Sequence, residues 1–420
     1  MKSSYKRLGD YIHKVEKRNR DLKVSNLVGL SMTKEFRVST SNIVGTDMSV
    51  YKVVNKWQFS CDFMSVIRVH KFPVVLKTDD DPVLVSPAYT VFEVNNVDVL
   101  NPEYLMMWFR RSEFDRYADF KCDSAIRGGF DWDALCDCFL PIPSLEKQQE
   151  IVREYKVIQN RIALNNLLIS KLEETAQAIY KQWFVDFEFP DENGKPYKSN
   201  GGEMVWSEEL EKEIPEGWEY NNIGSIIETI NGYAFKSDEF YDIGKYPILK
   251  IKNIKAPYVY IQDDTKYFNN NLPKNLDRII VSKGDILISM TGSGANQLNS
   301  AVGQVGKYYF SFPSLLNQRV CKLSPIHFYF KEFVYQFVSS KEIQTALLNG
   351  STGSANQANI SPDQIKELKV LIPSENLLIK FSKMTNVIDN FKGLEMIDKL
   401  ENLKNLLLAK MTKVETELIS

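Results

Sequence analysis

The sequence predicts an α+β protein in which two globular domains are separated by two long antiparallel paired helices and related by a pseudo-twofold internal repeat. Three observations predict this architecture: an apolar ladder in the middle of the chain, a second helical pattern near its C-terminal end, and segments that recur about 230 residues apart. The expected boundaries are 1–143 for the first globular domain, 144–190 for the central helix, 191–218 for an acidic linker, 219–373 for the second globular domain and 374–420 for the distal helix.

The apolar ladder runs from Ile151 to Trp183 at alternating intervals of four and three residues. This spacing is typical of the seam of a long helix that packs against another helix. Asn165 alone interrupts the seam. Such an amide either fixes the register of the helix pair or lies beside a polar partner or water.

The distal pattern runs from Leu377 to Leu418, with a slip in its register around Gly393. Segments before the two helices and inside the two globular parts also correspond in order, which indicates a duplicated globule–helix layout. The matching pairs are 142–144 with 372–374, 53–56 with 280–283, 82–85 with 313–316, and the helix openings Asn101-Pro102 and Ser324-Pro325.

The charge of the chain is unevenly distributed. The net charge of −2 conceals a local −8 between Asp186 and Glu219, so the remaining chain carries an excess of positive charge. DNA binding requires a basic face rather than a basic total, although such runs of charge are also found on ordinary solvated surfaces.

The composition excludes several other classes of protein. No apolar run reaches the length of a membrane helix and the first 20 residues do not form a secretory signal, so we expect a cytoplasmic protein. The five cysteines are scattered and the three histidines are isolated, which favours neither a metal site nor a general base. We therefore expect no catalytic residues and no metal ligands.

The length of the central helix has a functional implication. A helix over 151–183 measures roughly 50 Å at 1.5 Å per residue, whereas B-DNA completes one turn in about 34 Å. Two domains on such a rod could reach one duplex at sites more than a turn apart, with an unread spacer between them. The alternative is that a paired coil merely connects two unrelated domains.

Three motifs support a resemblance to a known family. They are Leu-Pro-Ile-Pro-Ser-Leu-Glu-Lys-Gln-Gln-Glu-Ile at 140–151, Ala-Ile-Tyr-Lys-Gln-Trp-Phe-Val-Asp-Phe at 178–187, and Ile-Pro-Glu-Gly-Trp-Glu at 214–219. Together with the duplicated layout, they resemble the specificity (S) subunit of Type I restriction-modification systems. The distal helix departs from that pattern, because it lacks the Gln-Gln pair and the Trp-Phe-Val-Asp-Phe ending.

The resemblance implies a non-catalytic, sequence-specific DNA-binding subunit. Its two target recognition domains would each read one half of an asymmetric bipartite site in double-stranded DNA. Two adenine methyltransferase (M) subunits and restriction-translocase (R) subunits would join it. S-adenosylmethionine, ATP and magnesium would bind these partners and not this chain. The alternatives are an orphan subunit that binds DNA or sequesters partners, a self-contained methyltransferase or nuclease, and a purely structural coil.

The candidate DNA-binding residues are polar or basic side chains in the two globular domains, each of which could equally be a solvated surface residue. Arg suits guanine and Asn suits adenine, whereas Ser, Thr and Gln bind phosphates and base edges. In the second domain we expect Lys250 and Lys252 on one face of a strand that ends at Asn253. The full set is Lys34, Arg37, Ser39, Asn42, Arg127, Lys250, Lys252, Asn253, Thr291, Ser293, Asn296, Asn317, Gln318 and Arg319.

Two further features have competing interpretations. Leu164, Leu167 and Leu168 fall off the main seam of the central helix, so they form either a docking surface for a partner subunit or the wide core face of a small bundle. Asn101-Pro102-Glu103-Tyr104 is similar to the adenine-binding loop of amino-methyltransferases, but a helix N-cap with Pro at the first position is the favoured interpretation.

Overall fold

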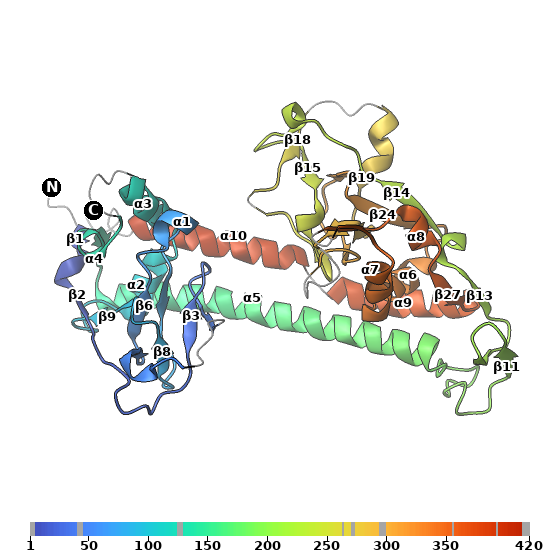
Figure 1. The fold of residues 1–420 in the computed structure, drawn as a ribbon, viewed down its shortest axis with the longest axis horizontal. Helices are drawn as coiled ribbons and strands as arrows, with labels where there is room; N and C mark the ends of the chain where they lie inside the picture. Colours follow the sequence, from blue (N-terminus) through green and yellow to red (C-terminus); the bar gives the residue numbers. More distant parts are fainter. Residues whose placement is uncertain are drawn as a thin grey trace. The chain divides into compact units, whose positions relative to one another are not determined.

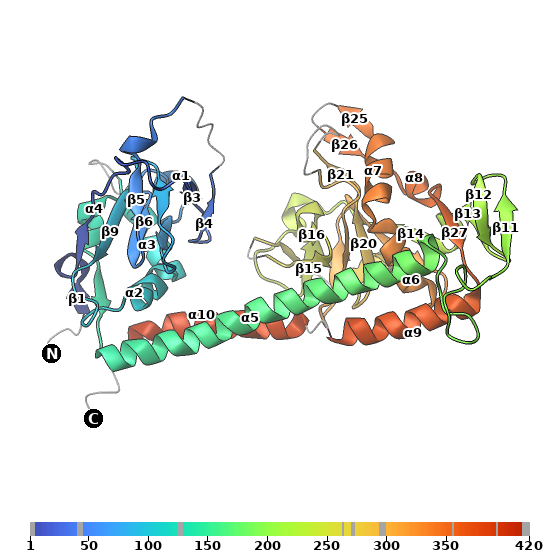
Figure 2. The same cartoon turned by 90° about the horizontal axis from the view of Figure 1, so that it is seen from below.

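The computed structural model describes residues 5–39, 45–123, 129–262, 264–269, 274–293, 300–354, 357–391 and 394–413. The chain divides into two units, each with its own core. Unit 1 contains Met1–Leu164 and Asp398–Ser420, and unit 2 contains Asn165–Ile397. Each unit combines β-sheets with helices (Figures 1 and 2), so the expected α+β class is confirmed.

Unit 1 is built around a four-stranded antiparallel sheet in the order β2-β9-β6-β7, with three two-stranded sheets beside it (β1-β10, β5-β8 and β3-β4). Its strands are β1 (Tyr5–Arg7), β2 (Ile12–Lys14), β3 (Val28–Leu30), β4 (Phe36–Val38), β5 (Lys52–Val54), β6 (Gln58–Cys61), β7 (Val74–Leu76), β8 (Val83–Val85), β9 (Thr90–Val94) and β10 (Phe139–Pro141). Its helices are α1 (Val66–Val69), α2 (Pro102–Phe109), α3 (Ser112–Asp123) and α4 (Trp132–Cys136), together with parts of α5 (Leu145–Tyr180) and α10 (Leu394–Lys410).

Unit 2 contains a six-stranded sheet in the order β14-β24-β20-β22-β17-β16 and a four-stranded sheet in the order β18-β15-β23-β19, with three smaller sheets (β13-β27, β21-β26-β25 and β11-β12). Its strands are β11 (Met204–Ser207), β12 (Lys212–Pro215), β13 (Glu219–Asn222), β14 (Ile227–Asn231), β15 (Tyr246–Leu249), β16 (Ile254–Lys255), β17 (Tyr258–Val259), β18 (Tyr267–Phe268), β19 (Ile280–Val281), β20 (Ile286–Ser289), β21 (Thr291–Gly292), β22 (Val305–Lys307), β23 (Ser314–Leu316), β24 (Val320–Pro325), β25 (Thr352–Ser354), β26 (Gln357–Asn359) and β27 (Lys369–Ile372). Its helices are α6 (Phe330–Val338), α7 (Lys341–Asn349), α8 (Pro362–Lys366) and α9 (Glu375–Phe391), with the rest of α5.

The internal repeat predicted from the sequence is confirmed by the strand pairings. The segments matched by sequence pair antiparallel in both units: β5 with β8, where Val53 lies opposite Leu84, and β19 with β23, where Ile280 lies opposite Leu315. The order β2-β9-β6-β7 in unit 1 likewise matches β14-β24-β20-β22 in unit 2. The shared topology shows that the recurring sequence segments encode a duplicated fold.

The helix expected from the apolar ladder is confirmed. α5 continues into a π-helical turn at Lys181–Val185, and the ladder positions from Ile151 to Trp183 are buried or half-buried. In unit 1, Val152 and Tyr155 join a core cluster with Leu408 and Met411. In this way the N-terminal part of α5 packs beside the end of α10.

The same helix packs against α9 in unit 2. Tyr180 and Trp183 contact Phe381, with ring centroids 6.3 and 5.8 Å apart, whereas Ile169 lines a cavity with Ile397. Because residues later in α5 lie beside residues earlier in the distal segment, the pairing is antiparallel. The distal pattern forms two helices, α9 and α10, on either side of the expected register slip; Gly393 and Leu418 lie outside the described residues.

Two expected elements differ in the structure. Ser324-Pro325 does not open a helix: both residues end β24, opposite Glu228 and Ile227, and α6 begins at Phe330. The ladder with β14 keeps this Ser-Pro pair extended, which corrects the expected helix opening. The segment expected as an acidic linker contains the antiparallel hairpin β11–β12, and the Trp218 ring that follows is buried against Phe187.

The Asn101-Pro102 segment is a helix N-cap, as favoured. The Asn101 side chain accepts hydrogen bonds from the backbone N–H groups of Glu103 and Tyr104 at 2.8 and 3.2 Å, and Pro102 occupies the first turn of α2. These bonds satisfy two of the helix's unpaired donors. The adenine-binding interpretation of this loop is therefore not needed to explain its composition.

Gln148, from the Gln-Gln pair of the first motif, fastens α5 to the loop that precedes α2. Its amide oxygen accepts a hydrogen bond from the Asn101 N–H at 2.8 Å, and its amide nitrogen donates to the carbonyl groups of Val99 and Pro143 at 2.9 and 2.8 Å. The side chain is fully buried. At the matching point of the second repeat, 230 residues later, the chain has the buried residue Leu378.

We expect Gln148→Leu to lower the free energy of unfolding by about 2 kcal/mol, because the substitution leaves buried backbone groups at Asn101 and Val99 without partners. Denaturant unfolding of the full chain measures this change. The control is Gln149→Leu at the adjacent exposed position, which we expect to stay within about 0.5 kcal/mol of the parent. Equal losses for both variants would contradict the role given to Gln148.

Candidate nucleic-acid interface

A turn between β23 and β24 presents polar side chains from a firmly held backbone in unit 2. The Asn317 N–H donates to the Leu249 carbonyl, the Gln318 N–H donates to the Tyr233 carbonyl, and the Arg319 carbonyl accepts from the Met290 N–H, each at 3.0 Å. The end of β15 and the segments that follow β14 and β20 therefore brace one turn. The side chains of Gln318 and Arg319 are exposed. We name residues 317–319 the recognition turn.

Gly232 allows the segment after β14 to approach this turn. A Cβ atom at position 232 would lie 2.1 Å from the Asn317 carbonyl oxygen, a distance that no side chain tolerates. The neighbouring Tyr233 N–H donates to the Leu316 carbonyl at 2.9 Å. Because the contact is between backbones, the recognition turn has little freedom to move when it meets a ligand.

Lys250 lies next to the recognition turn, since it directly follows the residue whose carbonyl binds Asn317. Its ammonium group lies 4.0 Å from the centre of the Phe240 ring. Partial burial lowers the pKa of Lys250, and the positive charges of Lys252 and Lys266 lower it further. Lys252 and Lys266 are each paired with a carboxylate, that of Asp264 and of Asp242, so their positive charges are largely offset. The Lys250 ammonium, beside the turn, suits contact with a polyanion.

The prediction that Lys250 and Lys252 share one face of a strand is wrong. β15 ends at Leu249, and the residues from Ile251 to Asn253 form a 3-10 turn. The side chain of Asn253 causes the change, because its oxygen accepts the Lys250 N–H at 2.8 Å and folds the chain back. Lys252 instead forms an ion pair with Asp264 at 2.5 Å.

Asn253 and Thr291 are buried, which corrects their expected role as DNA contacts. The Asn253 amide nitrogen donates to the Tyr260 carbonyl at 2.8 Å and to the Thr265 hydroxyl at 3.1 Å, so its bonding groups are used inside the fold. Thr291 is 5% exposed within β21. Ser293 is half-buried and its carbonyl accepts from the Ser300 hydroxyl at 2.6 Å, whereas Asn296 lies outside the described residues.

Lys34 is also buried, so its expected DNA contact is corrected too. Its ammonium group pairs with Asp115 at 2.7 Å and donates to the Phe109 carbonyl, and only 4% of the residue is exposed. Burial lowers the pKa of Lys34 despite the pairing with Asp115. The lysine therefore fastens the β3–β4 hairpin to α3 and the end of α2.

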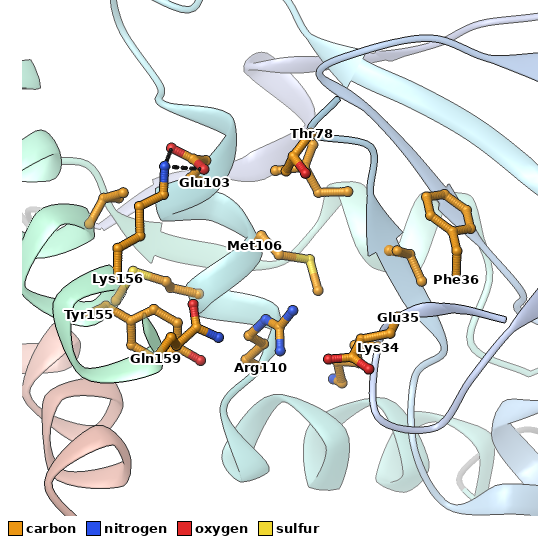
Figure 3. A pocket seen from close by; sticks show the side chains of 14 residues that line it. Lys34, Glu35, Phe36, Thr78, Glu103, Met106, Arg110, Tyr155, Lys156 and Gln159 are labelled. Atoms are coloured by element: carbon orange, nitrogen blue, oxygen red, sulfur yellow. Dashed lines mark hydrogen bonds and ion pairs between the residues drawn. The ribbon is translucent and has the colours of Figure 1, made fainter. Parts of the chain in front are cut away.

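A cavity of 250 Å³ adjoins Lys34 (Figure 3). Lys34 and Glu35 lie on one side of it, Tyr155 and Gln159 of α5 lie on the other, and Arg110 lies between them. At the rim, Lys156 of α5 pairs with Glu103 of α2 at 2.6 Å. These contacts attach the globular part of unit 1 to α5.

Arg37, a further candidate of unit 1, lies near the turn between β8 and β9, the counterpart of the recognition turn. Arg37 is exposed on β4, and it and Arg68 both act electrostatically on the Tyr89 hydroxyl; burial nevertheless raises the pKa of Tyr89. Ser39 is half-buried, and Asn42 and Arg127 lie outside the described residues. Unit 1 thus has arginines beside the same topological position.

The three leucines proposed for partner binding are exposed on α5. Leu164, Leu167 and Leu168 have 60%, 57% and 48% of their surface accessible. Leu164 belongs to unit 1 whereas Leu167 and Leu168 belong to unit 2, and within its own unit each side chain is exposed rather than part of the core.

Sequence reasoning missed Tyr233, Arg68 and Tyr89, which lie beside the candidate residues. An isolated Tyr or Arg has no local pattern that separates it from an ordinary surface residue. The Gly232-Tyr233 pair offered one signal, because a glycine inside a polar loop marks a close backbone approach.

The described residues contain no cluster of three His, Cys, Asp or Glu side chains arranged to hold a metal ion. All five cysteines are buried thiols. No helix in the described ranges is both long enough and apolar enough to cross a membrane.

Comparison with known proteins finds similarity to specificity subunits in each search. Residues 215–409 match the family model described as the Type I restriction modification DNA specificity domain. The chain is 24% identical over 312 residues to the Type I restriction enzyme MjaIX specificity subunit of Methanocaldococcus jannaschii, a match that covers 71% of this chain and 66% of that protein. It is 23% identical over 383 residues to the HindI specificity subunit of Haemophilus influenzae, covering 77% and 80%.

A solved structure shares the fold. The Type I restriction-modification S subunit from M. genitalium matches with a TM-score of 0.53 at 15% identity, over 97% of this chain and 95% of that one. The resemblance to specificity subunits expected from the three motifs is confirmed.

We expect Asn253→Ala to lower the free energy of unfolding by about 2 kcal/mol, because it leaves the buried groups that Asn253 binds without partners. Lys252→Ala, which removes only an ion pair at the surface, is the control and should change stability by less than about 1 kcal/mol. Thermal unfolding measures both. An Asn253→Ala variant of unchanged stability that no longer bound DNA would restore the base-reading role.

Proposed function

We propose that the chain is a non-catalytic specificity subunit that reads an asymmetric, bipartite site in double-stranded DNA. The proposal is supported by the match of residues 215–409 to the family model described as the Type I restriction modification DNA specificity domain. The domains over 1–143 and 219–373 each read one half of the site. The chain itself performs no chemistry; S-adenosylmethionine, ATP and magnesium belong to its partners.

The observation that carries the proposal is the duplication of one turn at the same place in the strand order. In both units the turn lies between two matched strands, β8 and β9 in unit 1 and β23 and β24 in unit 2. In unit 2 the backbone of this turn is held by three neighbouring segments, and Gln318 and Arg319 face solvent. A fixed backbone with free amide and guanidinium groups suits the readout of base edges.

The two turns carry different side chains, which supports an asymmetric target. Residues 317–319 are Asn-Gln-Arg, whereas residues 86–89 are Ser-Pro-Ala-Tyr with two arginines nearby. Since each base pair presents its own donor and acceptor pattern in the major groove, different side chains at equivalent places select different half-sites.

The surface proposed to bind methyltransferase subunits is apolar. The exposed leucines 164, 167 and 168 lie on α5, where methyltransferase subunits would dock. Restriction-translocase subunits would then join that complex.

Deletion of the gene in its host tests the function. We expect adenine methylation to disappear at one bipartite motif and to return when the gene is restored, as measured by sequencing that detects modified bases. A methylome that does not change would contradict the proposal. DNA binding by the purified chain without any change in methylation would instead identify an orphan recognition subunit.

Arg319→Ala tests the recognition turn. If the guanidinium reads a guanine through two hydrogen bonds, its loss weakens binding to the preferred duplex by about 5- to 150-fold and relaxes one position in one half-site. Selection from a library of random duplexes measures both effects. Lys369→Ala, at an exposed lysine paired with Glu209, is the control and should bind like the parent. A change in both half-sites would contradict the assignment of one domain to each half.

A further inference from the structure

A buried lysine connects the sheet of unit 2 to two helices. The ammonium group of Lys307, on β22, forms ion pairs with Glu332 of α6 and with Asp389 of α9, the latter at 2.9 Å. Lys307 has only 2% of its side chain exposed. A single side chain thus connects the six-stranded sheet of unit 2 to α9, the first part of the distal helical segment.

The strand beside β22 makes the matching connection to the central long helix. Tyr258 of β17 lies opposite Lys307 in the parallel β17–β22 pair. Its hydroxyl donates to the Glu173 carboxylate of α5 at 3.2 Å, and both groups are buried. Two paired strand positions therefore hold three helices, α5, α6 and α9. We name these residues (173, 258, 307, 332 and 389) the helix clamp.

The surroundings of the clamp keep its charges in place. The Lys307 ammonium lies 4.2 Å from the centre of the Tyr335 ring, and the Tyr309 hydroxyl donates to Asp389 at 3.4 Å. Burial lowers the pKa of Lys307, but the two carboxylates outweigh this effect and raise the pKa above its usual value. The lysine therefore stays charged throughout the neutral range.

The clamp differs from the attachment used in unit 1. The position that matches Lys307 is Lys77, whose N–H donates to the carbonyl of Gln58, the first residue of β6. The Lys77 side chain is also buried, but its ammonium pairs with Asp79, two residues along the chain. In unit 1 the polar contacts to α5 include those of Gln148 and the Lys156–Glu103 pair.

We propose that the helix clamp is a positioning site, which fixes the angle of the second recognition domain on the paired helices and so sets the spacer length that the protein accepts. The inference rests on the proposed function. Clamp residues do not touch DNA; they act through the recognition turn.

The chemistry of the clamp suits this role better than a role in stability. Buried ion pairs contribute little net stability compared with apolar packing, because the loss of hydration offsets their attraction. They are directional, however, and an alternative angle would leave Lys307 or Glu173 buried without its partner, which is costly. An apolar contact surface would tolerate small rotations.

The test uses the full-length chain with the proteins that co-purify with it. Duplexes selected from a random library define the preferred half-sites and spacer, and binding is then measured on duplexes with the preferred spacer and with one base pair more or fewer. We expect Asp389→Asn and Tyr258→Phe to keep the half-site sequences. The ratio of the affinity for the preferred spacer to the affinity for the altered spacers should fall by about fivefold or more. A domain that is held less firmly can follow a shifted half-site, so a duplex with the wrong spacer no longer has to deform.

Tyr308→Phe is the matched control. Tyr308 is equally buried, but its hydroxyl bonds to Ser314 at 2.6 Å and to the Phe312 carbonyl at 2.8 Å, and both partners belong to the same globular fold. We expect this variant to lose stability and to keep the parental spacer preference.

Three outcomes would overturn the inference. Clamp variants that melt earlier but keep the parental spacer preference would show that the clamp only stabilises the fold. Clamp variants that select different half-site sequences would show that the clamp does not act by positioning the second recognition domain. The parent chain is measured before any variant. If it selects no bipartite sequence, the proposed function itself is refuted.

Discussion

Both units depend on one apolar seam, because α5 supplies side chains to two separate cores. Val152 and Tyr155 complete the core of unit 1, and Trp183 and Phe184 complete the core of unit 2. Neither globular part can bury its apolar surface without this helix. The spacing of three and four residues must therefore be maintained over the whole ladder, since a shift in register at one end would turn apolar residues at the other end towards water.

The sequence predicted those parts of the fold that depend on local patterns. The ladder from Ile151 to Trp183 and the paired strands at 53 and 280 follow from periodicity and repetition, which are visible in a single sequence. The strand expected at Lys250–Lys252 did not form, because the side chain of Asn253 binds the Lys250 backbone and turns the chain. A hydrogen bond from a side chain to the backbone competes with the strand, and periodicity does not register it.

The candidate site was predicted less completely than the fold. Gln318 and Arg319 are exposed on a braced turn, as a DNA contact requires, but Lys34, Asn253 and Thr291 lie inside the protein. Polar residue type alone does not distinguish these two groups. Lys34 is drawn inward by Asp115, which lies 81 residues further along the chain, and a partner at that separation is a property of the tertiary structure.

The first strand and the end of α10 lie in the same unit, which has a consequence for biosynthesis. Leu408 and Met411 belong to the core of unit 1, and the Tyr5 hydroxyl donates to the Thr412 carbonyl at 3.5 Å. A ribosome releases the N-terminal strands long before these residues emerge from the exit tunnel. The nascent N-terminal domain must therefore wait, with part of its apolar surface uncovered, until the end of α10 has emerged. A truncated message would yield a chain that folds around residues 165–397 yet lacks the last pieces of its first domain.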